Sequence, residues 1–131
     1  FNIVYGIFTA DLTGGKSNQN QINVVSIVKL YPSTSLLVFG LLGPFVEECT
    51  YRLGLFNILK RFTTMGAYIL SALFFAAIHF NWSNPSVLEW LNIPPYFFSG
   101  LVFALVYDKF GFGASFLAHA TNNIISVIYS I

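Results

Sequence analysis

Charged residues are scarce in this chain. Asp, Glu, Lys and Arg make up 8% of its 131 residues, while apolar residues make up 56%, and the mean hydropathy is +0.70. A soluble domain normally carries about 25% charged residues, so the composition indicates that the chain is solvated by a lipid bilayer. The net charge of +1, with no run of Lys or Arg, argues against a nucleic-acid partner.

Cysteine is almost absent as well. Cys49 is the single cysteine, which excludes an intrachain disulfide. The chain begins Phe1-Asn2-Ile3, without an initiator Met or a basic segment that would mark a signal peptide. We therefore expect the chain to be a fragment of a longer membrane protein.

The pattern of apolar segments predicts an all-α fold, a polytopic transmembrane helical bundle. Residues 1–32 are interpreted as a helix remnant (1–10) and a polar loop (11–22), and residues 33–131 as the core. A helix is expected from Ser33 to about Leu59, and Phe62–Phe80 is long enough to cross a bilayer. The remaining expectations are a break at 81–85, a short interfacial helix at 86–92, a span at 95–107, a tight turn at 108–111 and a last span at 112–131.

Two adjacent acids, Glu47 and Glu48, follow an uncharged apolar stretch. Acids at membrane depth are costly and are usually functional. Glu48 and Arg52 are four residues apart and share a helix face, so they can pair, while Glu47 points about 100° away. We predict a structural Glu48–Arg52 ion pair beside a Glu47 that is available for proton transfer. A solvated crevice lined by both acids is the alternative.

The chain contains two histidines, His79 and His119, and both lie in apolar segments. His79 ends its segment and could be an interfacial side chain. Counted along its helix, it lies at a different membrane depth from His119, Glu47 and Asn123. His119 and Asn123 are four residues apart and face the same neighbour. They could join two helices by hydrogen bonds, or they could stabilise an oxyanion.

Three motifs occur in order on these segments. Glu47-Glu48-Cys49-Thr50-Tyr51-Arg52 matches EExxxR, Phe75-Ala76-Ala77-Ile78-His79 matches FxxxH, and His119-Ala120-Thr121-Asn122-Asn123 matches HxxxN. The set resembles the CPBP family, which comprises the CAAX proteases and bacteriocin-processing enzymes also called Abi. The resemblance covers roughly residues 35–131.

The resemblance implies an intramembrane endopeptidase, integral to a bacterial cell membrane, that acts on a peptide or membrane-protein substrate. By resemblance, Glu47 and His79 activate water, His119 and Asn123 stabilise the oxyanion, and Glu48 and Arg52 support the site. It implies roles in CAAX-type processing, bacteriocin maturation or self-immunity.

Rival chemistries remain open. Glu47, His79 and His119 could bind zinc as a His₂Glu set, but no local HExxH spacing supports this, so we favour a site without a metal cofactor.

Ser115 as a nucleophile would need a base within hydrogen-bond reach, and we interpret it as part of a packing face. A second membrane aspartate to pair with Asp108 is missing. A non-catalytic immunity or scaffold protein is the remaining alternative.

Overall fold

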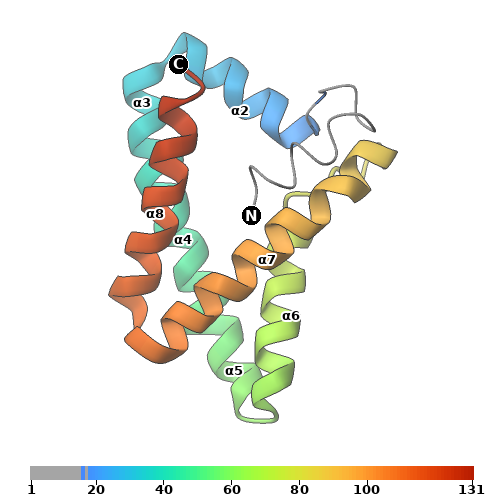
Figure 1. Cartoon of the computed structure of the whole chain (residues 1–131), viewed down its shortest axis with the longest axis vertical. Coiled ribbons are helices and arrows are strands. Elements are labelled where there is room, and N and C mark those ends of the chain that lie inside the picture. Colours follow the sequence, from blue (N-terminus) through green and yellow to red (C-terminus); the bar gives the residue numbers. More distant parts are fainter. Residues whose placement is uncertain (1–15, 17) are drawn as a thin grey trace.

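The computed structural model describes residue 16 and residues 18–131, and every regular element in that part of the chain is helical. This confirms the all-α class. Helices α3 and α4 run beside α8, while α7 crosses diagonally over α6 and α2 lies across one end (Figure 1). The helix predicted within residues 1–10 lies outside the described residues.

The first long segment is a continuous helical rod from Pro32 to Lys60, close to the predicted range. It stays continuous because the residues that join its pieces all have right-handed helical backbone angles. The rod contains two π-helical stretches, which the sequence did not signal and which often mark functional sites. Its pieces are α3 (Pro32–Leu37), η1 (Val38–Leu42), α4 (Gly43–Glu48), η2 (Cys49–Phe56) and α5 (Asn57–Lys60).

A helix, α2 (Gln19–Leu30), precedes this rod. The predicted loop at 11–22 is therefore wrong for its last four residues, Gln19 to Ile22. The physical reason is a cap: the Asn18 side chain accepts a hydrogen bond of 3.2 Å from the backbone N–H of Gln21. Asn is a favoured N-cap residue, so a polar stretch that looked like a loop begins a helix.

The next two helices are α6 (Thr64–Ala77) and α7 (Val87–Phe110). The break between them is confirmed, but α6 is shorter than the predicted span. The short helix at 86–92 and the separate span at 95–107 are wrong, because α7 is one helix with Pro94 and Pro95 inside it. Membrane helices tolerate internal proline. Of the described helices, α7 is the one long and apolar enough to cross a membrane by itself.

The last helix, α8 (Phe112–Ile128), begins directly after Gly111. The predicted turn at 108–111 is therefore too long, since α7 continues to Phe110. Gly111 has a φ of 85°, which a residue without a Cβ adopts at little cost. The reversal of the chain between α7 and α8 thus needs this one residue.

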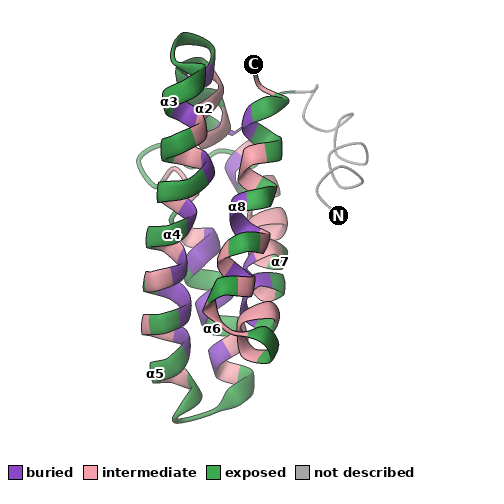
Figure 2. Cartoon of the chain, turned by 90° about the vertical axis from the view of Figure 1, so that its left-hand side faces the viewer, coloured by how far each residue is buried: buried purple, intermediate pink, exposed green. Residues whose placement is uncertain are grey.

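The buried residues lie on the sides of the helices that face one another (Figure 2). Many large apolar side chains are exposed instead, including Leu37, Phe45, Leu73 and Leu117, as lipid contact would require. Helices α6 and α7 pack closely against each other at Gly100. A Cβ placed there would lie 3.0 Å from the Ala72 Cα and 3.2 Å from the Phe75 ring.

We predict that Gly100→Val destabilises the protein by about 1–3 kcal/mol, because the added methyl groups would force α6 and α7 apart. Thermal unfolding in detergent measures the loss. Gly113→Val is the matched control, since a Cβ at Gly113 would meet nothing within 4 Å. Equal stability of the two variants would contradict this account of the α6–α7 contact.

Candidate active site

The site is built around a buried ion pair between Glu48 and Arg52. The Arg52 Nε atom lies 3.3 Å from the Glu48 Oε2 atom, and both side chains are fully buried. The Arg52 guanidinium also lies over two rings, 5.4 Å from the Phe75 centroid and 6.0 Å from the Phe103 centroid. The predicted pairing is confirmed, and it places a cation–π contact in the core.

Glu48 has further partners that the sequence analysis did not assign. Its Oε1 atom lies 3.0 Å from the His119 Nδ1 atom, and its Oε2 atom accepts a hydrogen bond from the Ser115 hydroxyl. The Ser115 Oγ atom also lies 3.0 Å from the Phe103 carbonyl oxygen. Ser115 is fully buried. Because its hydroxyl binds the Glu48 carboxylate, it supports Glu48 as well as packing between the helices. Its spacing of four residues from His119 was the available signal.

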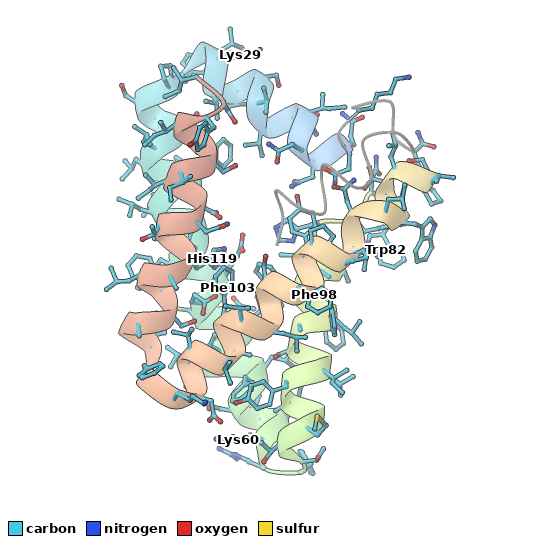
Figure 3. The ribbon with its side chains drawn as sticks, viewed as in Figure 1. Lys29, Lys60, Trp82, Phe98, Phe103 and His119 are labelled. Carbon is cyan, nitrogen blue, oxygen red and sulfur yellow. The ribbon has the colours of Figure 1, made fainter. Side chains whose placement is uncertain are left out.

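His119 lies between the two acids of the first motif. Its Nε2 atom is 3.6 Å from the Glu47 Oε2 atom, and its ring stacks on Phe103 at 4.3 Å between centroids. Figure 3 shows His119 and Phe103 next to each other on α8 and α7. An ionised carboxylate only accepts hydrogen bonds, so the Glu48 contact places a proton on Nδ1 and leaves Nε2 facing Glu47.

Glu47 differs from Glu48 in exposure. Its side chain is 26% exposed, whereas that of Glu48 is fully buried. The two acids are adjacent in α4 yet occupy different environments, as the helical geometry predicted. Of the two acids, Glu47 is therefore the one whose side chain is partly exposed, while its Oε2 atom, which faces His119, is buried.

His79 lies in the turn that follows α6. Its Nδ1 atom is 2.8 Å from the Phe75 carbonyl oxygen, which only accepts hydrogen bonds. The proton is therefore on Nδ1, and Nε2 carries a lone pair. The Phe75 ring lies 5.0 Å from the His79 ring and 5.5 Å from the His119 ring, so both histidines contact one phenylalanine despite their different depths.

Asn123 faces the same neighbour as His119, the long rod, as predicted from their spacing. Its Nδ2 atom donates a hydrogen bond of 3.1 Å to the Phe39 carbonyl oxygen, in the first π-helical stretch. The amide thus joins α8 to the long rod. The second N–H of the same Nδ2 atom is the one that could serve a ligand.

The alternative zinc site would use Glu47, His79 and His119 as ligands. Within the described part of the chain, no three His, Cys, Asp or Glu residues are grouped so that they could hold a metal ion. As the side chains are arranged, Glu47, His79 and His119 are thus not grouped as a metal centre, although the bond from His79 Nδ1 to the Phe75 carbonyl leaves Nε2 able to bind a ligand.

Comparison with known proteins assigns the family. Residues 29–125 match the model of the type II CAAX prenyl endopeptidase Rce1-like family, which is more than half of the chain. The chain belongs to the Rce1-like family. The CPBP resemblance is thereby confirmed, and with it the membership of a family of membrane-embedded proteases. All three motifs lie within the matched residues.

A curated relative extends the similarity of this Rce1-like chain. The UPF0177 protein YvdC of Lactococcus lactis is 24% identical over 131 residues, which is 99% of this chain and 48% of the relative. The chain thus spans about half the length of that protein. The comparison with solved structures finds no match.

We predict that Arg52→Leu destabilises this Rce1-like chain by about 3–5 kcal/mol, because it leaves the Glu48 carboxylate buried without its cation. Denaturant unfolding in mixed micelles measures the effect.

Asp108→Asn is the control for Arg52→Leu, since it removes the Lys60–Asp108 ion pair, which is partly exposed. A pair of that kind contributes about 1 kcal/mol or less. Similar losses in the two variants would contradict a central role for the buried pair.

Proposed function

We propose that this chain carries the catalytic site of an intramembrane endopeptidase that hydrolyses a peptide bond with activated water. The observation that carries the proposal is the partly exposed Glu47 side chain, whose Oε2 atom has no hydrogen-bond partner among the described residues and lies beside His119, a residue fixed by the buried Glu48–Arg52 pair. The membership of the Rce1-like family supports the same activity. A polytopic bundle, in which the long rod, α6, α7 and α8 cross the bilayer, is part of the proposal.

The proposed first step is activation of water by Glu47 and His79. Glu47 takes a proton from the water, and the His79 Nε2 lone pair accepts the second hydrogen bond of that water. The resulting hydroxide attacks the substrate carbonyl. This division fits the tautomer that Phe75 imposes on His79 and the exposure of Glu47. General base catalysis of this kind typically contributes about 10²–10⁴-fold.

The attack places negative charge on the carbonyl oxygen, and His119 and Asn123 are proposed to stabilise it. His119 can donate from Nε2 when that nitrogen carries a proton, and Glu48 holds the ring through Nδ1. Asn123 would donate the N–H that Phe39 does not use. Collapse of this intermediate restores the carbonyl and breaks the C–N bond, and Glu47 gives its proton to the leaving amine, which completes hydrolysis.

The proposed partners are a peptide or membrane-protein substrate and the surrounding bilayer. Processing of a prenylated CAAX-type terminus, bacteriocin maturation and self-immunity are the candidate roles. We propose the reaction without a metal cofactor, because Glu47 and His79 suffice to hold and deprotonate the water.

We predict that Glu47→Gln abolishes cleavage, because the amide cannot take a proton from water. Mass spectrometry of products from membranes that contain either protein measures this and identifies the cleaved bond. Asp108→Asn, an acid-to-amide change outside the site, should cleave normally at matched expression. Biological activity retained by Glu47→Gln would favour the non-catalytic immunity or scaffold alternative.

We predict that Asn123→Ala lowers kcat by about 10²-fold or more, as the loss of an oxyanion donor does. Thr121→Ala is the neighbouring control, since Thr121 is exposed, and it should leave kcat unchanged. Turnover on the substrate identified above measures both. An unchanged rate in a folded Asn123→Ala protein would remove Asn123 from the oxyanion role.

A further inference from the structure

Glu89 is a buried acid that none of the three motifs contains. Its residue is 3% exposed, and both carboxylate oxygens accept hydrogen bonds from the backbone. The Oε1 atom lies 2.9 Å from the Gln19 nitrogen, and the Oε2 atom lies 3.1 Å from the Asn81 nitrogen. One side chain therefore joins α2, the loop after α6 and the start of α7.

The local sequence predicts a different use for Glu89. Ser86 and Glu89 have the spacing of a capping box, in which the Glu side chain returns to the N–H of the cap residue. Ser86 does cap α7, but the Glu89 carboxylate binds the first N–H of α2 instead. That N–H is one of the donors a helix leaves without a partner, and an anion is favourable at a helix N-terminus.

The N-terminus of α2 in turn contacts the surroundings of His79. The Asn20 Nδ2 atom donates to the Tyr96 hydroxyl at 3.3 Å, and the Asn18 Nδ2 atom donates to the His79 carbonyl at 3.5 Å. The Tyr96 ring stacks on the His79 imidazole, with 4.1 Å between centroids and 16° between planes. A chain of contacts therefore runs from Glu89 through α2 to the plane of the His79 ring.

Asn18 and Asn20 precede residue 29, where the match to the family model begins. The His79 site is thus supported by a segment outside the matched core. Glu89 is well suited to hold that segment, because it fixes α2 and the residue two positions after His79 at the same time.

We propose that Glu89 is a positioning residue that orients His79 for catalysis by holding the N-terminus of α2 against Tyr96. The proposal rests on the proposed function only for its catalytic consequence. The orientation of the His79 ring can be measured without a substrate.

The test uses the fact that the chain has two histidines. The full chain is labelled with ¹⁵N-histidine in lipid nanodiscs, and the ring nitrogen spectrum reports the tautomer of each imidazole. His79→Gln assigns the two sets of signals. The wild-type His79 should show a single tautomer with the proton on Nδ1, as the Phe75 carbonyl requires.

Glu89→Gln should replace this pattern by a mixture of tautomers for His79 and leave the His119 signals unchanged. The cause is that the Gln amide nitrogen cannot accept one of the two backbone N–H groups. Asp108→Asn makes the same chemical change at the far end of α7 and should move neither histidine. A His79 spectrum of Glu89→Gln identical to wild type would overturn the proposal.

Asn20→Ala provides a second test that leaves Glu89 in place. It removes the bond to the Tyr96 hydroxyl and should shift the His79 signals, whereas Asn23→Ala, on the exposed face of α2, should not. If Glu89→Gln fails to fold, unchanged His79 signals in Asn20→Ala overturn the proposal.

Activity separates this proposal from the proposed function. On the identified substrate, Glu89→Gln should lower kcat by about 10–100-fold with little change in KM, as a small misplacement of a catalytic group does. If Glu47→Gln still cleaves while Glu89→Gln shifts the His79 signals, the proposed mechanism fails and the positioning role stands. If the His79 signals do not shift, the positioning role fails whatever the activity.

Discussion

The arrangement of the site depends on the buried ion pair between Glu48 and Arg52. An isolated buried charge is strongly unfavourable, so each of these side chains requires the other. The pair is also surrounded by compensating contacts, because Glu48 binds His119 and Ser115 while Arg52 lies against the Phe75 and Phe103 rings. Since α4, α6, α7 and α8 all contribute to this group, the ion pair fixes the helices that carry the reactive side chains.

The pair also explains how two adjacent acids acquire different roles. Glu48 is fully buried and uses its oxygens to hold other residues, so its charge is committed to structure. Glu47 is one position along the helix, partly exposed, and faces the opposite nitrogen of the same imidazole. His119 is therefore anchored on one side by Glu48 and presents its other side to the partly exposed Glu47. Two carboxylates that take different roles because their environments differ are a recurrent arrangement in hydrolytic sites.

Much of this could be predicted from the sequence, since it follows from spacing along a helix. The Glu48–Arg52 pair, the separate direction of Glu47 and the helical rod that begins near residue 33 are of this kind. Contacts between distant helices had no such signal: the Glu48–His119 bond, the Tyr96–His79 stack and the two bonds of Glu89 depend on tertiary packing. Pro94 and Pro95 were misleading for a related reason, because α7 is stabilised by its neighbours and continues through both prolines.

The central claim is that Glu48 holds His119, and a double-mutant cycle tests it most directly. Unfolding free energies of wild type, Glu48→Gln, His119→Gln and the double variant, all measured in the same mixed micelles, give the coupling between the two side chains. Residues in one buried hydrogen-bond network typically couple by about 0.5–3 kcal/mol, and the 3.0 Å contact predicts a coupling of about 1 kcal/mol or more. Additive effects of the two substitutions would contradict the claim.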